Sequence, residues 1–551
     1  MKQYFPLFII LLLWIFFEIV INPIGEFPLN DDWAYAKVVQ SLVADHQFKL
    51  CDWQGMTFII QLVWGYLFCL PFGFSFTALR ISTLVMSLFG ILFFYKISLS
   101  TTNNKKLTFL GTLLLAFNPL YFQLSNTFMT DVPFLVLSLT ACWYFINYFK
   151  NERSTDFYFA ILFSILAVMI RQVGIVMLVA FGICLLVKEF NIKNVLKAIL
   201  PVLSAIALLF IYRTILISRN NLPANYNFQI DVAITSLLHP TREVFLKFIY
   251  YSMTSTVSMG IFILPLIVPF TIVWFKKNPL SKKKIIIGSV FFASYLSLIF
   301  LKVFLTHKYL PFTGDIFYHL GLGPVILTNA ISYELPQLTI FSKLFWIGLS
   351  TAGALSITLL TMTTIDVFRK IINKKLYRQN TTIGLLFLII VSLLYFLPIS
   401  IIYVSDRYLL FVFPLTIIFF LSCCSWFELP HRNKYYTLSL SLIVPYIYFS
   451  ISATHDFLSL NKARWQALDY LTNEENISPK EIDGGFEFNA WHLFKFENYH
   501  PDVNKRWWWI EKDNYIVTSE KVQGYNVIKE YEYKQWMPYK NCPLFILQKP
   551  N

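Results

Sequence analysis

The feature that most constrains this chain is a succession of long apolar stretches separated by short polar connections. A helix needs roughly 20 apolar residues to cross a membrane, and about thirteen stretches of the 551-residue sequence approach that length. Only 14% of the residues are charged and 57% are hydrophobic, whereas about a quarter of the residues of soluble proteins are charged. The sequence therefore predicts an all-α polytopic membrane protein.

The expected spans follow one another along most of the chain. The first, residues 4–21, has no small-residue cleavage site after it, so we expect it to be retained rather than removed as a signal. Residues 34–43 have apolar positions at helical spacing and are expected to lie in the interface. Residues 56–72 are apolar but have a stop at Pro71, so we expect an interfacial or re-entrant helix that does not cross. The other expected spans are residues 78–98, 107–124, 132–149, 157–170, 173–187, 195–217, 248–275, 285–305, 345–368, 381–403, 408–427 and 436–453.

The distribution of basic residues predicts the orientation. Lys and Arg gather in alternate connections, and the positive-inside rule places those connections in the cytoplasm. The N-terminus is then cytoplasmic, and the first loop and the tail lie outside a plasma or inner membrane. The net charge is +14, but the basic residues lie in these short loops and form no basic stripe on a soluble face. We therefore expect no nucleic-acid partner. The basic connections are residues 105–106, 150–153, 188–197, 276–284, 369–378 and 432–434.

Composition divides the chain into two expected domains. Residues 1–453 form a membrane domain, in which residues 30–72 are the first outer loop, and residues 454–551 form a small α+β outer domain. The tail has a helical pattern over Asp456–Leu471 and β-like runs at 515–518, 525–531 and 543–548. We expect Trp507-Trp508-Trp509 in its core or at the membrane interface. The cysteines have no zinc spacing, no cofactor or divalent metal is implied, and a disulfide between Cys51 and Cys542 is left open.

Two adjacent carboxylates, Asp31 and Asp32, follow the first span in the sequence Asn30-Asp31-Asp32-Trp33-Ala34-Tyr35. Acids so close to lipid usually pair or do chemistry. One of them can cap the following helix, which leaves the other to be explained. Trp33 and Tyr35 provide aromatic rings that can cover a sugar. We therefore expect a functional site at this loop.

Further charged residues are expected on the same face. Asp131, in Thr130-Asp131-Val132-Pro133, either joins the site or only begins a helix. Arg171 interrupts an apolar stretch and needs a partner, for which a phosphate is suitable because Arg binds it with a planar fork. Arg407 either joins the site or pairs with the neighbouring Asp406 or snorkels. Asp52 either reaches the same cleft or only makes a turn.

These residue types fit one reaction. A carboxylate beside an acceptor hydroxyl or amine can take its proton as a general base. Arginines can hold a phosphate leaving group and offset its developing charge. The surrounding spans provide a groove for a long-chain lipid. The pattern therefore indicates transfer of a sugar from a lipid phosphate.

The motifs also resemble those of a known family. The stretch Asn30–Ala36 resembles the acidic first-outer-loop motif of the GT-C membrane glycosyltransferases, in particular the group of protein O-mannosyltransferases and the lipid A aminoarabinose transferase (glycosyltransferase family 39-like). The stretch Thr130–Pro133 resembles that group's second acidic site, and Arg171 stands where a basic residue often follows the fifth span. Arg407-Tyr408-Leu409-Leu410 with Pro414 is similar to its late Arg-Tyr-Leu-Leu pattern.

The resemblance implies an inverting transfer from a polyprenyl-phosphate sugar to a cell-envelope glycan, lipid or protein. Asp31 is then the base, and Asp32 caps the helix or orients the acceptor. Two departures are Asp32 in place of the usual Glu and Asp52-Trp53-Gln54 in place of a Glu-x-x-Pro-Pro pattern. A flippase or transporter of lipid-linked saccharides, and a polymerase or ligase of lipid-linked glycans, are the alternatives. The expected catalytic residues are Asp31, Asp32 and Asp131, and the expected substrate-binding residues are Trp33, Tyr35, Asp52, Arg171 and Arg407.

Overall fold

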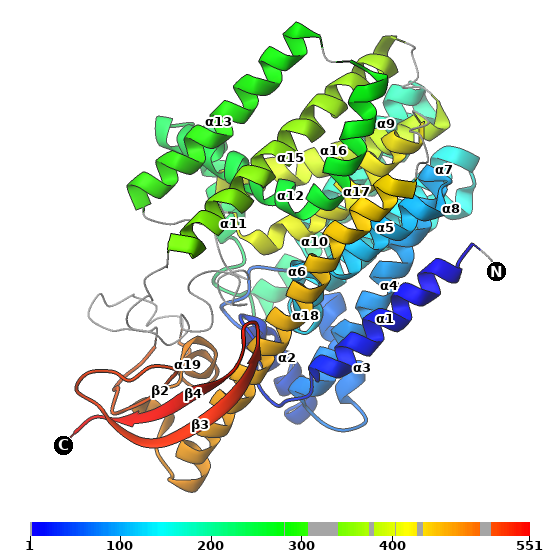
Figure 1. Ribbon diagram of the computed structural model, residues 1–551. Helices are drawn as coiled ribbons and strands as arrows, with labels where there is room; N and C mark the ends of the chain where they lie inside the picture. Colours follow the sequence, from blue (N-terminus) through cyan, green and yellow to red (C-terminus); the bar gives the residue numbers. More distant parts are fainter. Residues whose placement is uncertain are drawn as a thin grey trace.

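The protein is a bundle of long helices with a small sheet at one end (Figure 1). The computed structural model describes residues 3–550 except 280, 307–339, 374–378, 403, 427–432 and 496–508. Within that part of the chain, nine helices are long and apolar enough to cross a membrane, and a bent pair, α5 (Lys105–Ala116) and α6 (Pro119–Ser125), makes ten. The chain is therefore a multi-pass membrane protein, as its composition predicted.

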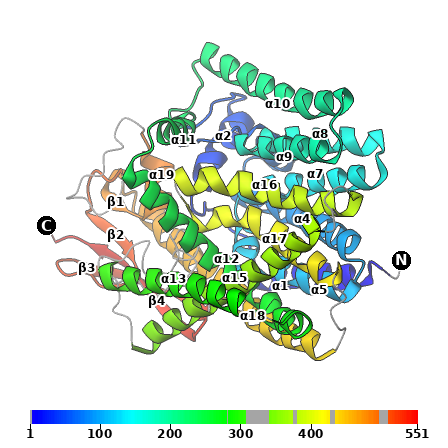
Figure 2. The ribbon, with the colours of Figure 1, turned by 90° about the horizontal axis from the view of Figure 1, so that it is seen from above.

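Each predicted span corresponds to one helix, except that residues 107–124 correspond to the bent pair α5 and α6. Three of the single helices, α1 (Phe5–Ile21), α8 (Ser154–Val168) and α9 (Ile175–Lys188), are shorter than the other single helices. Figure 2 shows α8, α9 and α10 side by side along one side of the bundle. The remaining long helices are α4 (Phe76–Thr102), α7 (Asp131–Asn151), α10 (Ile192–Ser218), α12 (Arg242–Lys277), α13 (Lys282–Thr306), α15 (Ile340–Asn373), α16 (Asn380–Ile402), α17 (Leu409–Trp426) and α18 (Asn433–Asp469).

The first outer loop contains two short helices, α2 (Asp32–Ala44) and α3 (Ile59–Cys69). At 1.5 Å per residue, the 11 residues of α3 span about 16 Å, which is too short to cross a membrane core of about 30 Å. The length of α3 agrees with the expectation that this segment does not cross, which stays a prediction. Helix α2 was expected to lie in the interface, but Trp33–Ala36, Val38 and Val39 are buried within the protein. A further short helix, α11 (Phe228–Leu238), was not predicted.

The basic connections meet at one end of the bundle. Lys188 pairs with Glu152 at 2.6 Å, Lys106 Nζ donates to Asn433 Oδ1 at 3.0 Å, and Lys370 Nζ donates to Asn278 Oδ1 at 3.0 Å. Each contact joins two connections that the positive-inside rule assigned to the same face. The alternation of the spans is therefore as predicted, while their orientation relative to the cytoplasm remains a prediction.

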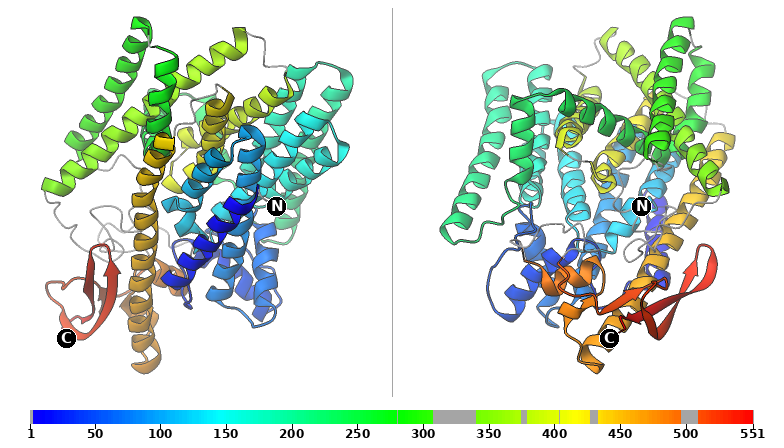
Figure 3. Two further views of the ribbon diagram at one scale, coloured as in Figure 1. Left: turned by 45° about the vertical axis from the view of Figure 1, so that its right-hand side comes forward. Right: turned by 90° about the vertical axis from the view of Figure 1, so that its left-hand side faces the viewer.

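Helix α18 connects the bundle to the C-terminal region. Its 37 residues span about 55 Å, nearly twice the thickness of a membrane core. Figure 3 shows it extending from the bundle to the level of the sheet. The helix predicted over Asp456–Leu471 is therefore a continuation of the last span. The proposed domain division at 453/454 falls within this helix, so the two parts share one rigid element.

The sheet has four strands in the order β1-β2-β4-β3, with β1 parallel to β2 and the other pairs antiparallel. All three predicted strands are present, and β3 and β4 are longer than predicted. Cys51 and Cys542 are free thiols, so they form no disulfide. Trp507 and Trp508 lie outside the described residues. The strands are β1 (Ile482–Asp483), β2 (Tyr515–Thr518), β3 (Asn526–Trp536) and β4 (Tyr539–Gln548), and a short helix, α19 (Phe486–Leu493), follows β1.

The β3–β4 hairpin docks on α18 through one carboxylate. Asp456 Oδ1 accepts a hydrogen bond from the backbone N–H of Trp536 at 2.6 Å, and its Oδ2 accepts one from that of Met537 at 3.1 Å. The neighbouring ring of His455 stacks on that of Trp536, with ring centroids 3.6 Å apart. The turn of the hairpin is thus fixed to a helix that begins at the far end of the bundle.

We expect Asp456→Ala to loosen the hairpin, because it leaves two amide donors without their acceptor at a cost of about 1–3 kcal/mol each. Hydrogen exchange at Trp536 and Met537 should then accelerate by roughly tenfold or more. Glu532→Ala is the control, since this exposed side chain accepts from the side-chain amide Asn541 Nδ2, at 3.2 Å, and from no backbone amide of the described residues. Equal exchange rates in the two variants would contradict docking through Asp456.

Candidate functional site

Asp31 lies between the first span and α2, and its side chain contacts Arg407 and Trp53. One oxygen, Oδ2, is 3.0 Å from Arg407 Nη1, and the other, Oδ1, accepts a hydrogen bond from the indole N–H of Trp53 at 3.1 Å. Asp31 occupies the N-cap position of α2, but its side chain makes no capping hydrogen bond. The carboxylate is therefore turned toward a cation and not toward the helix that it precedes.

Asp32 has a different environment. Its Oδ1 accepts from the backbone N–H of Leu29 at 2.6 Å, and its Oδ2 accepts from that of Phe128 at 3.2 Å. It is the first residue of α2 and does not cap it, contrary to the expectation from the sequence. Its side chain instead closes the turn before α2 and fixes this turn to the segment that leads into α7.

Burial raises the pKa of Asp32 from 3.8 to about 8, although the Arg80 guanidinium and the two amides act in the opposite direction. A pKa near neutrality is typical of a general base, but a base must also reach its substrate. Asp32 is only 2% exposed, and both of its oxygens accept from backbone amides. This geometry suits a positioning residue better than a base.

Asp131 and Arg171 form a second, buried ion pair. Arg171 Nη2 is 2.8 Å from Asp131 Oδ1, and Arg171 Nε donates to Thr130 Oγ1 at 2.8 Å. Asp131 begins α7, and Arg171 lies in the break between α8 and α9. The sequence predicted that Arg171 needs a partner, and in the structure this partner is Asp131 of α7.

The break that carries Arg171 is held by the loop before α3. The backbone N–H of Phe58 donates to the carbonyl of Ile170 at 3.0 Å, and Thr57 Oγ1 donates to that of Val168 at 2.7 Å. Gln172 Nε2 donates to the carbonyl of Gly55 at 3.1 Å. The first two bonds satisfy carbonyl groups that the end of α8 leaves free, and the third ties the residue after Arg171 to the loop, so Arg171 is set on a fixed backbone.

The two ion pairs belong to one site. The ring centroid of Tyr408 lies 5.8 Å from Cζ of Arg171 and 5.5 Å from Cζ of Arg407. The hydroxyl of Tyr35 interacts with the same charged groups. Burial raises the pKa of Tyr35 to about 12, and Asp31 and Asp131 act in the same direction, whereas the two arginines oppose this shift. We call this set the charged cluster, and it comprises Asp31, Arg407, Asp131, Arg171, Tyr35 and Tyr408.

Two of the expected binding residues lie elsewhere. Asp52 is exposed, and its Oδ1 accepts from the backbone N–H of Ala224 at 3.0 Å, so it holds the segment before α11. Its neighbour Trp53 reaches Asp31 instead. Trp33 is fully buried and packs against the rings of Trp53, Phe486, Phe494 and Trp509, with centroids 5.0–6.4 Å away. Its ring is therefore covered by the C-terminal region rather than open to a sugar.

Two buried charges that support the acidic loop were not predicted. Glu487 of α19 accepts from the backbone N–H of Asn30 at 3.1 Å and pairs with Arg464 of α18 at 2.6 Å. Arg80 of α4 donates to the carbonyls of Pro23, Gly25 and Phe27. Arg80 could have been found as a cation within an apolar span, a placement that is usually functional or paired. Glu487 lies in the tail and carries no such signal.

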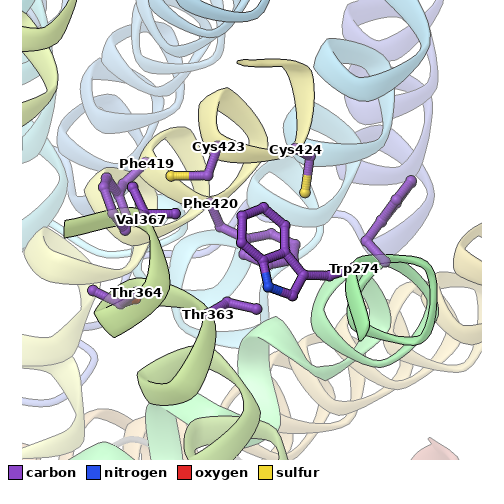
Figure 4. A pocket seen from close by; sticks show the side chains of 9 residues that line it. Trp274, Thr363, Thr364, Val367, Phe419, Phe420, Cys423 and Cys424 are labelled. Atoms are coloured by element: carbon purple, nitrogen blue, oxygen red, sulfur yellow. The ribbon is translucent and has the colours of Figure 1, made fainter. Parts of the chain in front are cut away.

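Figure 4 shows a small cavity lined by Trp274 of α12, Thr363 of α15 and Cys423 of α17 among others, none of which belongs to the charged cluster. Its volume of about 10 Å³ is at the lower limit for one water molecule, so it holds no substrate. Over the described residues, no group of three or more His, Cys, Asp or Glu side chains could hold a metal ion.

Comparisons with known proteins can now be set beside this geometry. A family model described as dolichyl-phosphate-mannose-protein mannosyltransferase matches residues 58–217. That segment contains Asp131 and Arg171, whereas Asp31 and Arg407 lie outside it. The resemblance to this group of GT-C membrane glycosyltransferases, which the motifs predicted, is therefore confirmed for this part of the chain. The comparison with curated proteins returned no match.

Several solved structures are similar to this chain, and two of them contain a polyprenyl or dolichol phosphate. One is the archaeal oligosaccharyltransferase AglB from Archaeoglobus fulgidus, in complex with an inhibitory peptide and a dolichol-phosphate, with a TM-score of 0.43 and 14% identity over 88% of this chain. This chain spans only 59% of that protein's length. The other is ArnT from Cupriavidus metallidurans bound to undecaprenyl phosphate, with a TM-score of 0.42 and 10% identity over 98% of this chain and 97% of that chain.

The raised pKa of Asp32 predicts a pH dependence of stability. Because this pKa is about 8 in the folded chain, the folded state keeps a proton that the unfolded chain releases above about pH 4. The resulting stabilisation is complete below about pH 4 and is lost as the pH rises through 8. Asp32→Asn should remove this dependence, so the difference in Tm between wild type and variant should change between about pH 4 and 8.

Asp45→Asn serves as the control for this measurement, because Asp45 is an exposed acid at the other end of α2. The Tm difference between wild type and this variant should stay nearly constant over the same range. A constant difference for Asp32→Asn as well would contradict the raised pKa.

Proposed function

We propose that this protein is a membrane glycosyltransferase that moves a sugar from a polyprenyl-phosphate donor to a hydroxyl or amine of a cell-envelope glycan, lipid or protein. The observation that carries this proposal is the convergence of two acid–arginine pairs around Tyr408 at one end of a membrane bundle. An acid can serve as the base for an acceptor, and an arginine can hold a phosphate. The match of residues 58–217 to a mannosyltransferase family model supports the same reaction class.

In the proposed step, Asp31 is the general base. The acceptor oxygen or nitrogen forms a bond to the anomeric carbon, and its proton passes to the Asp31 carboxylate. The bond between the anomeric carbon and the phosphate oxygen breaks, and its electron pair leaves with the polyprenyl phosphate. Attack from the face opposite the leaving group inverts the anomeric centre. The indole of Trp53, which donates to Oδ1, orients the carboxylate for this task.

Arg407 is proposed to bind the donor phosphate. The side chains of Arg407 and Asp31 are 14% and 16% exposed, whereas those of Arg171 and Asp131 are only 5% and 1% exposed. The outer pair is therefore the one that a substrate can reach. A phosphate that draws Arg407 away from Asp31 would also make Asp31 a stronger base, because a nearby cation lowers the pKa of a carboxylate. Donor binding and activation of the base are then coupled.

The inner pair, Asp131 and Arg171, is proposed to shape the site. A buried pair is costly to break, since the charge that remains is unpaired. It therefore fixes the ends of α7 and α8 relative to each other and keeps a positive field beside Tyr408. We place this site and the C-terminal domain outside the membrane, with the N-terminus in the cytoplasm, because the basic connections lie at the opposite end.

The first test replaces the base. Asp31→Asn should lower turnover of a short-chain polyprenyl-phosphate sugar by about 100-fold or more, since general-base catalysis contributes roughly 10²–10⁴. Asp45→Asn, an exposed acid of the same loop, should retain turnover, and Tm should show that both variants fold. Full activity of Asp31→Asn would overturn the assignment. Passage of the lipid-linked sugar across vesicles without its consumption would favour a transporter or flippase.

The second test concerns the donor phosphate. Arg407→Gln should raise KM for the donor by roughly 10- to 100-fold, the equivalent of one lost hydrogen bond to a charged group. KM for the acceptor should change much less. Arg153→Gln is the matched control, because Arg153 is exposed and lies in a basic connection at the other end of the bundle. A rise in KM for the acceptor alone would contradict the proposed role.

A further inference from the structure

A groove lies at the end of the bundle opposite the charged cluster. It has a volume of about 390 Å³ and runs between the N-terminal parts of α1, α5 and α18. In Figure 1 the N-terminus, where α1 begins, lies far from the sheet. Ligand sites in proteins typically measure about 300–1,000 Å³, so the groove is large enough to hold part of a ligand.

The walls of the groove are apolar and face outward. Ile9 of α1 and Leu440 of α18 are 36% and 40% exposed, and Phe109 of α5 is half-buried between them. In a membrane protein such a surface meets acyl chains rather than water. The groove can therefore take one hydrocarbon chain along the helices.

One end of the groove is positively charged. Lys105 and Lys106 line it, and neither forms an ion pair with any of the described residues. Lys106 Nζ donates to Asn433 Oδ1 and lies 5.5 Å from the ring centroid of Tyr436, which also lines the groove. An aromatic ring with a polar tip beside lysines is the usual composition of the headgroup level of a membrane. The ligand that complements this end carries negative charge.

We propose that this groove binds a phospholipid with an anionic headgroup. Lys105 and Lys106 hold the headgroup phosphate, the Tyr436 hydroxyl lies beside it, and one acyl chain lies along Ile9, Phe109 and Leu440. The ammonium groups compensate the charge of the headgroup, and the apolar walls select a lipid over a soluble anion. The site is separate from the charged cluster and does not depend on the proposed glycosyl transfer.

The inference can be tested by native mass spectrometry of the full chain, purified with phosphatidylglycerol or with phosphatidylcholine of the same acyl chains. The wild type should retain phosphatidylglycerol preferentially. The double variant Lys105→Gln, Lys106→Gln should weaken this retention by roughly tenfold or more, since each basic residue contributes about 1 kcal/mol at an anionic surface. The matched control, Lys282→Gln with Lys283→Gln, removes the same charge from exposed positions of α13 outside the groove and should retain the lipid.

A second variant tests the groove rather than its charge. Ile9→Trp keeps both lysines but fills the apolar part, and it should also lose the bound phosphatidylglycerol. Equal losses in the two double variants would overturn the proposal, because the lysines would then act only as a general positive surface. Retention by Ile9→Trp at the wild-type level, or displacement of the lipid by inorganic phosphate, would overturn it too. The Tm of each variant shows whether it folds.

Discussion

Backbone N–H and C=O groups at the ends of helices near a membrane need hydrogen-bond partners inside the protein. The segments that carry the charged cluster are held in place by such hydrogen bonds. The chain is irregular before α2, before α3, before α7 and at the break after α8. Asp32 binds amides from the first and third of these places, and Gln61 Nε2 donates to the carbonyl of Phe128 at 2.9 Å. Thr57 and Phe58 bind carbonyls at the end of α8. The first outer loop thereby fixes the segments that carry Asp31, Asp131 and Arg171.

The two acid–arginine pairs of the charged cluster differ in how exposed their side chains are. The buried pair of Asp131 and Arg171 holds two helix ends together, and the more exposed pair of Asp31 and Arg407 remains available to a ligand. The two acids of the Asp31-Asp32 sequence are divided in the same way. Adjacent residues at the start of a helix point in different directions, so Asp31 meets a cation while Asp32 accepts from two amides. The two adjacent aspartates therefore make different kinds of contact, Asp31 with an arginine and Asp32 with backbone amides.

The C-terminal region reaches the same loop from the other side. Arg464 of the long helix α18 pairs with Glu487, and Glu487 accepts from the amide of Asn30, directly before Asp31. Trp33 is covered by rings from the same region, including Phe486. Helix α18 continues from the bundle into this region without interruption. The acidic loop is connected to this region at two places, through the hydrogen bond from Asn30 to Glu487 and through the rings that cover Trp33. The C-terminal region thus acts as a support for the site.

The sequence by itself determined the order of the apolar helices, the grouping of their basic connections and the strands of the tail, because hydrophobic period and charge are local properties. It predicted about thirteen spans, whereas nine or ten helices of the described residues are long and apolar enough to cross a membrane. It also predicted Asp31, Asp131, Arg171 and Arg407 as candidates for one site, with a purely structural role left open for Asp131 and Arg407. Only the tertiary structure decided which acid meets which arginine, and that Trp53 rather than Asp52 reaches Asp31. It also decided that Glu487 supports the loop. Such contacts join residues far apart in the chain, and no local pattern encodes the direction in which a side chain points.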